Sequence, residues 1–398
     1  MLDAVFRNGR VSRANIAREL GLTRSTASSL VAGLTDEGLL IEDISPEDKG
    51  AGTGRPGTFV RLNPKHALFI GADIGVGRIS VVAIDFTGTV VKKHHFEVDD
   101  RDCSPEAVLT MLATFVKSVA GPLVAHYTVR GLCVTVPGVL DKSGTVLRAP
   151  FLGWRKVPIL DQLTALLPDM PVIVAENDAN AFAIAHGYRT GQIASDTDVF
   201  MFLDAGVGGA AVMFGQLMRG HDGYAGEFGH IILGDRGFVQ LATPAGSLES
   251  FIGLDAILAR NVHHGGGSSD IQTFIEQVKA VEPPAVATMN DWSFYMGRAL
   301  ALLSSIFNPS RIVLGGPVAA LFDLCKADVL ASIRKNLLED HPVPTVMLSD
   351  LGLEGPALGG AFMLHREMFS VDEGLIFRKQ EDDSQGTRIP RHNLSLIS

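Results

Sequence analysis

The sequence predicts an α/β protein that consists of a small N-terminal head and a larger body of two lobes. Two short helical segments separated by a glycine, followed by two strand-like runs, predict the head within residues 1–63. Two glycine-rich turns, each between two strand-like runs and about half a chain apart, predict two related lobes that face each other across a cleft. We place the lobes at residues 68–187 and 188–370 and a polar tail at 371–398, and the length of 398 residues suits two or three domains.

The composition indicates a well-packed protein of the reducing cytoplasm. Hydrophobic residues make up 46% of the chain, yet no apolar run reaches the roughly 18 residues that cross a bilayer. The first residues lack the apolar core and the small-residue cleavage site of a signal peptide. Three scattered cysteines, Cys103, Cys133 and Cys325, have neither a metal-binding spacing nor a disulfide pattern. We therefore expect a cytoplasmic protein without a membrane partner.

Charge is distributed unevenly between the head and the body. The first 65 residues carry nine basic and eight acidic side chains, whereas the remainder carries 25 basic and 36 acidic ones. Within residues 1–34, five arginines are accompanied by only two acidic residues. A locally basic end on an acidic body is expected of a DNA-reading module joined to a domain with another task.

Helix signals in the head follow the spacing of a helix-turn-helix. Ser12 and Thr23 stand where the N-caps of two successive helices are expected, with a glycine in the turn between the helices. Ala17 is small where the two helices would cross, and Ala27 and Leu30 are expected to face back onto the first helix. This combination predicts the motif in which the second helix enters the major groove of DNA.

The outer face of the second helix, over residues 24–34, carries short polar side chains and one arginine, which suit phosphates and base edges. Strand-like runs at 39–41 and 58–62 then predict a wing, whose Gly54-Arg55-Pro56 segment could place an arginine in the adjacent minor groove. The alternative is a small helical domain that contacts proteins. We assign the contacts with operator DNA to Arg13, Arg24, Ser25, Thr26, Ser28, Ser29 and Arg55.

In the body, a strand-like run at 171–175 leads into Asn177 and Asp178, and a small-residue helix leads out. Asparagine offers a donor and an acceptor, and aspartate accepts two hydrogen bonds or takes a proton, so the pair suits hydroxyl groups. The alternative is that it only caps the helix. A Pro-Gly turn at Gly138, after a strand at 131–136, would bring backbone close to a ligand.

A second group of polar residues follows the second glycine turn. Glu227 and His230 lie three residues apart in a glycine-rich segment, which suits a polar pocket. Glu249 then opens a helix that we expect to run to about Arg260. Trp154 lies in a loop where it could flank a sugar or simply pack under the loop, and the sequence leaves both possibilities open.

Six segments of the body occur in the order of a known family: residues 71–75, 136–138, 176–180, 225–230, 308–316 and 357–361. Residues 68–365 thereby resemble the ROK family of sugar kinases and sugar-responsive repressors. Residues 1–63 resemble the winged head of its xylose and N-acetylglucosamine repressor branch. The resemblance implies a two-lobed, actin-like ATPase fold of the ribonuclease H type, with the C-terminal helix returning to the first lobe. It also implies that the sugar contacts are Gly138, Asn177, Asp178, Glu227, His230 and Glu249.

The phosphate-binding turns depart from the pattern of the kinases in that family. Gly77 stands where those kinases carry threonine, Ala205 lacks the corresponding hydroxyl, and Asp204 adds a negative charge where polyphosphate would lie. One like-charge contact at about 4 Å and an effective dielectric constant of about 20 costs about 4 kcal/mol. We therefore expect that the protein does not bind ATP and is not an enzyme.

The zinc loop of the family is also missing. Residues 240–247 contain none of its three cysteines, and one histidine alone cannot hold a structural zinc ion. We expect no zinc and no other cofactor. Packing of Phe238, Leu241 and Leu248 is expected to hold this loop, which leaves His230 to donate directly to a sugar hydroxyl.

The sequence thus predicts a transcriptional regulator, and specifically a repressor of carbohydrate-use genes. It would bind a palindromic operator as a homodimer or homotetramer, under the control of a sugar or sugar derivative. A sugar kinase with Asp178 as its general base is a second hypothesis. A DNA-binding scaffold controlled by a partner protein is a third.

Overall fold

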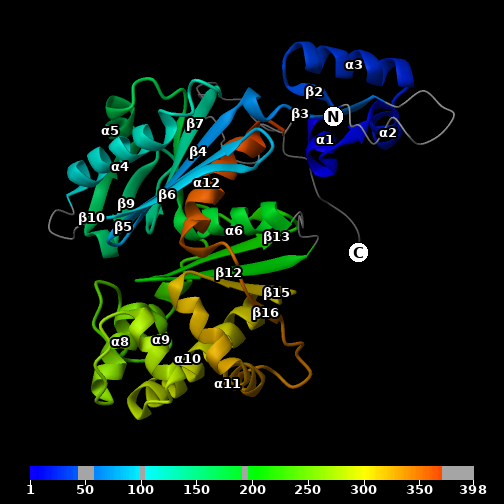
Figure 1. Cartoon of the computed structure of the whole chain (residues 1–398). Helices are drawn as coiled ribbons and strands as arrows, with labels where there is room; N and C mark the ends of the chain where they lie inside the picture. The colour runs from blue at the N-terminus through cyan, green and yellow to red at the C-terminus, as the bar shows by residue number, and fades with distance from the viewer. Residues whose placement is uncertain (44–57, 99–103, 191–195, 370–398) are drawn as a thin grey trace, which may run out of the picture.

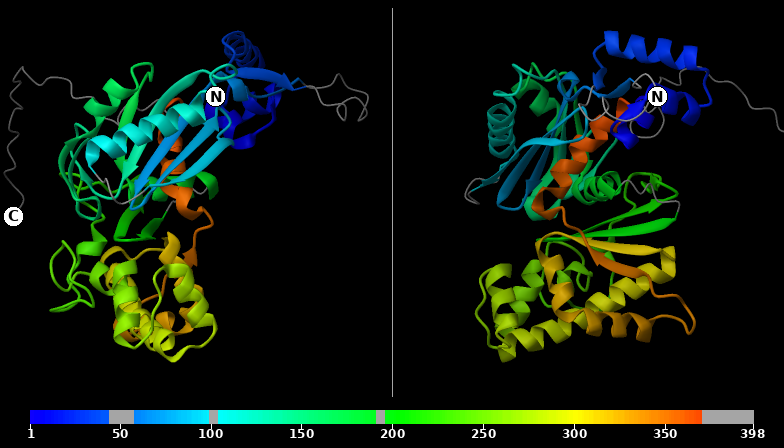
Figure 2. Two further views of the ribbon diagram at one scale, coloured as in Figure 1. Left: turned by 60° about the vertical axis from the view of Figure 1, so that its left-hand side comes forward. Right: turned by 45° about the vertical axis from the view of Figure 1, so that its right-hand side comes forward.

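The head lies beside the upper of two stacked lobes, in an arrangement that Figures 1 and 2 show from three directions. We call the upper lobe, residues 68–190, lobe 1, and the lower lobe, residues 196–354, lobe 2. The predicted minor-groove residue Arg55 and the predicted tail fall outside the described residues. The computed structural model describes residues 1–43, 58–98, 104–190 and 196–369.

The head consists of three helices closed by a small sheet. The side chains of Ser12 and Thr23 accept hydrogen bonds from the backbone N–H groups of Asn15 and Thr26, which confirms both predicted caps. The strands pair in the order β1-β3-β2, so the predicted returning strand lies in the middle. The elements are α1 (Leu2–Asn8), β1 (Val11–Ser12), α2 (Arg13–Glu19), α3 (Arg24–Asp36), β2 (Leu40–Asp43) and β3 (Phe59–Leu62).

One predicted core position of the head is wrong. Leu30 is 47% exposed, whereas Val31 is fully buried together with Ala27. Residues three and four apart both lie near one face of a helix, and the burial shows that Ala27 shares the inward face with Val31 and not with Leu30. Leu30 therefore belongs to the outer surface of α3.

The sheets of the two lobes have the same strand order and the same strand directions. In each, a hairpin is extended by a third antiparallel strand on one side and by two parallel strands on the other. This repeat confirms the expected pair of related lobes. Lobe 1 has the order β11-β7-β4-β5-β6, with β4 (Leu68–Gly75), β5 (Arg78–Asp85), β6 (Val90–Glu97), β7 (Val129–Val136) and β11 (Ile173–Asn177). Lobe 2 has the order β14-β13-β12-β15-β16, with β12 (Thr197–Leu203), β13 (Val207–Met213), β14 (Gln216–Leu217), β15 (Arg311–Gly315) and β16 (Thr345–Leu348).

Lobe 1 carries a second, small sheet in the order β10-β9-β8. Trp154 opens β10 and is only 3% exposed, so the loop packs over it and the possibility that it flanks a sugar is not realised. The remaining elements of the lobe are α4 (Pro105–Ala120), β8 (Val139–Leu140), β9 (Thr145–Ala149), β10 (Trp154–Pro158) and α5 (Ile159–Leu166).

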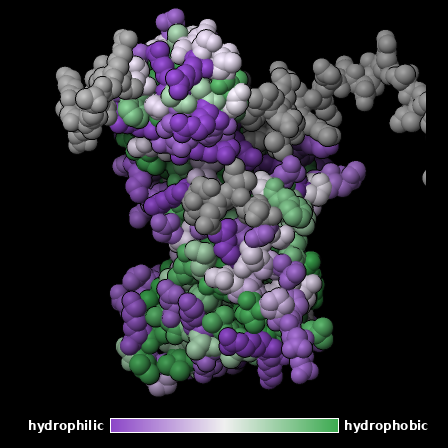
Figure 3. All heavy atoms as spheres, turned by 90° about the vertical axis from the view of Figure 1, so that its right-hand side faces the viewer, coloured by the Kyte–Doolittle hydropathy of each residue, from purple (hydrophilic) through white to green (hydrophobic). Residues whose placement is uncertain are grey.

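Lobe 2 is rich in helices, and here one predicted helix is two. The chain leaves the helical conformation at Gly253, where φ is −70° and ψ is 168°, so the helix that begins at Glu249 ends after one turn. Figure 3 shows hydrophobic side chains among the polar ones on one face of this lobe. The helices are α7 (Glu249–Ile252), α8 (Leu254–His263), α9 (Ile271–Lys279), α10 (Pro283–Phe307) and α11 (Leu321–Asn336).

Two helices, α6 (Asp178–Thr190) and α12 (Gly355–Glu367), lie where the two lobes meet. α12 packs on β4, β5 and β7 of lobe 1, and α6 packs on both α12 and the β12–β13 hairpin of lobe 2. A Cβ atom added to Gly359 would lie 1.8 Å from the carbonyl oxygen of Ala181, so only glycine permits the close approach of these two helices. No helix within the described ranges is both long enough and apolar enough to cross a membrane.

Candidate functional site

A cavity of about 1580 Å³ lies between the two lobes. Its walls come from the end of β11 and the start of α6 in lobe 1, and from the glycine-rich segment after β14 in lobe 2. The lining includes every residue that the resemblance assigns to sugar binding: Gly138, Asn177, Asp178, Glu227, His230 and Glu249. The structure therefore brings together residues that are up to about a hundred positions apart in the chain.

Asn177 caps α6 and also faces the Pro-Gly turn. Its Oδ1 accepts a hydrogen bond from the N–H of Asn180 at 3.0 Å, while its Nδ2 donates to the carbonyl oxygen of Gly138 at 3.2 Å. The helix-cap alternative is thus correct for Asn177, but the same side chain lines the cavity. Capping fixes its rotamer, which presents the remaining amide donor and acceptor capacity to a ligand without further ordering.

Asp178 is the first residue of α6 and is almost fully buried. Its Oδ1 accepts a hydrogen bond from the N–H of Ala179 at 2.8 Å. Burial raises the pKa of the Asp178 carboxyl well above its usual range, and the neighbouring carboxyl of Asp73 raises it further. The other oxygen can exchange hydrogen bonds with a ligand hydroxyl, as donor or acceptor according to its protonation.

The lobe 2 wall presents two buried polar atoms that lack partners among the described residues. His230 Nδ1 and Glu249 Oε1 lie 3.8 Å apart and neither makes a hydrogen bond. Burial raises the pKa of both Glu227 and Glu249, and the attraction of His230 opposes that shift. Unsatisfied buried polar groups are costly, so these atoms are poised to bond a polar ligand.

The position of this wall depends on a glycine. The short helix η4 (Phe228–His230) follows Gly226, whose φ is 98°. A Cβ atom there would lie 2.3 Å from the carbonyl oxygen of Gly209 in β13. The backbone can therefore approach the hairpin closely enough to direct Glu227 and His230 into the cavity only because residue 226 is glycine.

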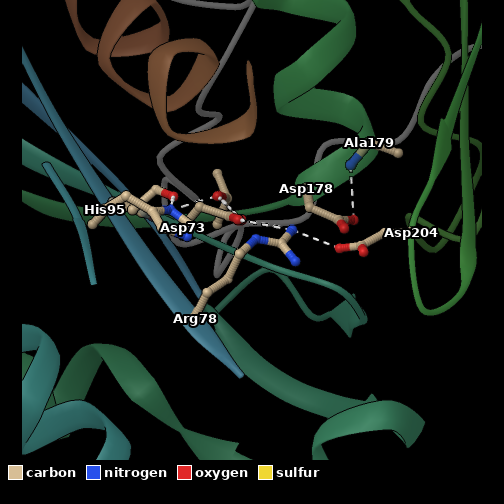
Figure 4. A network of polar contacts seen from close by, with 9 residues as sticks. Asp73, Arg78, His95, Asp178, Ala179 and Asp204 are labelled. Carbon is tan, nitrogen blue, oxygen red and sulfur yellow. Dashed lines mark hydrogen bonds and ion pairs between the residues drawn. The ribbon is translucent and has the colours of Figure 1, made fainter. Parts of the chain in front are cut away.

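The first glycine turn is filled by the side chain of Arg78, whose importance the sequence did not reveal. A Cβ atom on Gly75 would lie 2.6 Å from Arg78 Cζ, so the guanidinium rests on the turn itself. Arg78 Nη2 lies 2.5 Å from Asp204 Oδ2 across the cleft and 3.9 Å from Asp73 Oδ2. Figure 4 shows the guanidinium reaching toward Asp204, with Asp178 beside the pair.

The ion pair changes the expected role of Asp204. The sequence predicts a negative charge at Asp204 that would repel polyphosphate, and the structure adds that Arg78 pairs with this carboxylate and offsets its charge. Arg78 is itself buried, and its two carboxylate partners raise its pKa against the effect of burial. The guanidinium therefore lies against the first glycine turn and joins the two lobes through Asp204.

The second glycine turn is covered by an aromatic ring. Phe151, in the short helix η3 (Pro150–Leu152) of lobe 1, lies over Gly206, where a Cβ atom would be 2.4 Å from the ring. This residue was also missed from the sequence, because the contact joins two lobes through positions 55 apart. The aromatic ring offers no hydrogen bond to a phosphate.

A second ion pair crosses the cleft on the other side of Asn177. Arg219 Nη2, from the segment after β14, lies 2.5 Å from Glu176 Oε2 at the end of β11. The other oxygen of Glu176 accepts hydrogen bonds from the N–H of Asn177 at 2.9 Å and from Asn180 Nδ2 at 3.0 Å. Two cross-lobe ion pairs therefore flank Asn177 and Asp178.

The residues at the expected zinc loop do not fit a zinc ion. No group of three or more His, Cys, Asp or Glu side chains in the described part of the chain could hold a metal. Instead the Phe238 ring packs edge-on against Phe251 and Tyr295 at 5.3 Å, and Leu248 is buried in the core of lobe 2. The expected packing by Phe238 and Leu248 is confirmed, and Leu241 is only partly buried.

On the head, the outer face of α3 presents Arg24, Ser25, Thr26 and Ser29 to solvent, while Ser28 is half-buried. Arg13 lies on α2, and its Nη2 is 2.7 Å from Glu42 Oε1 on β2. A phosphate contact by Arg13 would have to compete with this ion pair, which makes Arg24 the stronger candidate.

Comparison with known proteins supports this division into head and body. The ROK family profile matches residues 69–367, and the IclR helix-turn-helix domain matches residues 2–43. The xylose repressor of Bacillus subtilis is 24% identical over 90% of this chain and 92% of its own length. The glucokinase of Streptomyces coelicolor is 28% identical over 74% of this chain and 96% of its own.

Two solved structures share the fold. A ROK family glucokinase from Streptomyces griseus, in complex with glucose and AMPPNP, superposes with a TM-score of 0.65 at 26% identity, covering 74% of this chain and 98% of its own. A ROK family transcriptional regulator, homologous to the E. coli MLC protein, superposes with a TM-score of 0.72 at 21% identity, covering 90% of this chain and 92% of its own. The family profile extends over most of the chain, and the protein therefore belongs to the ROK family.

Proposed function

We propose that this protein is a sugar-responsive DNA-binding repressor whose cleft binds a sugar and not a nucleotide. One observation carries the proposal: the polar set expected to bind hydroxyls lines one cavity, and at the two glycine turns that line the same cavity the side chains of Arg78 and Phe151 lie against Gly75 and Gly206. The helix-turn-helix head supplies the means to bind operator DNA. The similarity to the xylose repressor, over nearly the whole length of both chains, supports the same reading.

A sugar would be held from both lobes. Asn177 and Asp178 would bond adjacent hydroxyls from lobe 1. His230 and Glu249 would satisfy their unpartnered atoms on hydroxyls from lobe 2. A ligand that bonds both walls favours one separation of the lobes over others. The coupling needed for a useful response is modest, about 1–3 kcal/mol.

We expect two side chains that line the cleft to hinder the binding of a nucleotide. The Arg78 guanidinium rests on Gly75, and the Phe151 ring rests on Gly206. A polyphosphate would have to displace both and break the Arg78–Asp204 ion pair. We therefore propose that Asp178, although placed where a kinase would have its general base, acts only in sugar binding.

The head would bind DNA through α3. Arg24 is positioned for a phosphate, and the hydroxyl groups of Ser25, Thr26 and Ser29 for base edges or phosphates. One head reads only one half-site, so binding of a palindromic operator requires two heads. We propose a homodimer or homotetramer, whose assembly is tested by light scattering with and without DNA.

Isothermal titration with D-xylose, D-glucose and N-acetyl-D-glucosamine tests sugar binding, and titration with AMPPNP tests nucleotide exclusion. We expect at least one sugar to bind and AMPPNP not to bind. His230→Ala should abolish or strongly weaken sugar binding, whereas His126→Ala, an exposed histidine outside the cavity, should not.

Two results would count against the proposal. Phosphorylation of a sugar in a coupled ATPase assay would favour the kinase hypothesis. Absence of binding by every sugar tested, together with a protein partner that alters operator affinity, would favour the scaffold hypothesis.

A further inference from the structure

One hydrophobic cluster extends without interruption from the head into lobe 2. It includes Val5 of α1 and Val31 of α3, then Phe362 of α12 and Phe182 of α6, and finally Phe200 and Phe202 of β12. The head is thus not a freely tethered module. Its core is continuous with the core on which the two lobes meet, and close-packed interiors transmit displacement.

Helix α6 connects the cleft to the head. It begins at Asp178, in the cavity, and its Tyr188 lies near the other end, about 15 Å along the helix axis. Between them Ala179 lies against Gly208 of lobe 2, and Ala181 lies against Gly359 of α12. Since α6 belongs to lobe 1 and packs on β12 and β13 of lobe 2, a change in lobe separation alters its packing.

Phe6 of α1 contacts the far end of this helix. Its ring centroid lies 5.5 Å from that of Tyr188, 5.1 Å from that of His365 and 5.3 Å from that of Phe369. The turn at Gly88 also packs on the Phe6 ring. Phe6 therefore inserts the head into an aromatic socket, which we define as Tyr188, His365, Phe369 and Gly88.

The socket has a defined hydrogen-bonding arrangement. His365 Nε2 lies 3.0 Å from the carbonyl oxygen of Phe86, which can only accept, so Nε2 carries the proton. Burial lowers the pKa of His365 to about 4, so the ring is neutral, and its Nδ1 accepts from the Tyr188 hydroxyl at 2.8 Å. Tyr188 is thereby held in one orientation against Phe6.

We propose that α6 transmits occupancy of the cleft to the DNA-binding head through the contact of Phe6 with the aromatic socket. The proposal rests on the proposed function, because it describes how a sugar at Asp178 would act on the operator. A ligand that draws the lobes together repacks the first turns of α6 against lobe 2. The helix is short and internally hydrogen-bonded, so its last turn moves with its first. The displacement at Tyr188 then changes the packing around Phe6, and hence the orientation of α1.

The test measures operator affinity with and without sugar in Phe6→Ala and in a control, Phe96→Ala. Phe96 is another half-buried phenylalanine that stacks on an aromatic ring, Phe115, but it lies on β6 away from the socket. We expect the wild type and the control to show the same sugar-dependent fold-change in operator affinity. We expect Phe6→Ala to bind sugar as the wild type does, with a sugar-dependent change of less than about threefold. A coupling of about 1–3 kcal/mol corresponds to about 5–150-fold in the wild type.

A milder pair of variants guards against misfolding of Phe6→Ala. Phe6→Tyr and Tyr188→Phe keep an aromatic ring at the contact, and we expect both to retain most of the response. Thermodynamic linkage requires that operator DNA change the sugar affinity by the same factor by which sugar changes the operator affinity. In Phe6→Ala, the effect of operator DNA on sugar affinity should therefore also be close to onefold.

The outcomes separate this inference from the proposed function. If the wild type responds to sugar and Phe6→Ala responds equally, the inference is overturned while the function stands. If Phe6→Ala binds DNA more weakly but keeps the full sugar response, the contact is only a static support, and the inference is again overturned. If the wild type binds no sugar in the panel, the proposed function itself fails.

Discussion

The Asp178 carboxyl group lies in the cleft at the first residue of α6, where burial and the neighbouring Asp73 raise its pKa. A carboxyl group in such a setting can transfer a proton or form hydrogen bonds to a hydroxyl group. The neighbours decide between them. Arg78 and Phe151 lie against the two glycine turns, and on this ground we propose that Asp178 recognises a hydroxyl group and takes no part in phosphoryl transfer.

Asp178→Asn tests this role. The amide keeps the volume and the bond from the N–H of Ala179, but it replaces the oxygen that faces the ligand with an NH₂ group, which can only donate to a sugar hydroxyl. We expect the sugar Kd to rise about fivefold or more, as for loss of a buried hydrogen bond, with unchanged operator affinity in the absence of sugar. Titration calorimetry and fluorescence anisotropy measure the two quantities. Asp222→Asn, at the exposed rim of the same cavity, is the matched control, and equal effects of the two changes would contradict the assignment.

Asp73 makes stability depend on pH. Burial raises the pKa of its carboxyl to about 6, from an unfolded-state value of 3.8. The native state therefore keeps a proton that the unfolded state releases, and the free energy of unfolding falls as pH rises from about 4 to about 6. In Asp73→Asn this titration is absent. We expect the unfolding free energy of the wild type, relative to the variant, to fall by about 2–3 kcal/mol between pH 4 and pH 7 in urea denaturation. A difference that stays constant with pH would contradict the account.

At the residue scale, the sequence could predict which side chains line the cleft but not what fills it. Asn177 and Glu227 lie in recognisable segments, and the structure places both on the cavity. The Arg78–Asp204 pair joins strands of two lobes, so its existence depends on lobe separation, which no local pattern encodes. An arginine directly after a glycine turn, with an acidic residue at the matching turn of the second lobe, was the available signal.

Among the elements, α3 carries the predicted DNA contacts, and its outer face supports a test by salt dependence. Arg24→Ala should remove one phosphate contact if the exposed Arg24 binds the DNA backbone as predicted. We expect weaker binding to all DNA sequences and a decrease of about one in the slope of log K against log salt. Arg155→Ala removes the same charge from an exposed position on lobe 1 and should leave the slope unchanged. An unchanged slope in Arg24→Ala would exclude this helix face.

The packing of α6 on α12 depends on Gly359. A Cβ atom there would lie 1.8 Å from a backbone oxygen of α6, whereas a Cβ atom on Gly187 of α6 would meet nothing within 4 Å. We expect Gly359→Ala to lower the free energy of unfolding by about 1–3 kcal/mol through overpacking. We expect Gly187→Ala to raise it by about 0.5–1 kcal/mol through helix propensity. Chemical denaturation measures both, and equal effects would show that the two helices are not closely packed.

Helix and strand positions were largely predictable, since caps and glycine turns act locally. Ser12 and Thr23 cap the helices as expected. The two features that the sequence predicted wrongly depend on tertiary contacts. Gly253 breaks the expected helix after Glu249 where its backbone approaches the carbonyl oxygen of Ala205 in the second turn. Leu30 faces outward because α2 packs on the face of α3 that carries the next residue in the chain.

For the whole molecule, the repeated strand order explains why a ligand between the lobes can act at a distance. Each lobe has its own sheet and core, and the cross-lobe contacts are concentrated near the cleft and along α6. The sequence indicated two lobes from the paired glycine turns. It could not indicate that the head shares a core with α6, because Phe6 and Tyr188 are 182 positions apart.

The central claim is that sugar in the cleft controls the affinity of the protein for operator DNA, and one measurement tests it most directly. Fluorescence anisotropy gives the affinity of the full-length protein for a DNA fragment that the protein itself selects from a random pool, with and without saturating sugar. The account predicts that a sugar shown by calorimetry to bind the cleft weakens operator affinity by about 5–150-fold. Sugar binding that leaves operator affinity unchanged would contradict it.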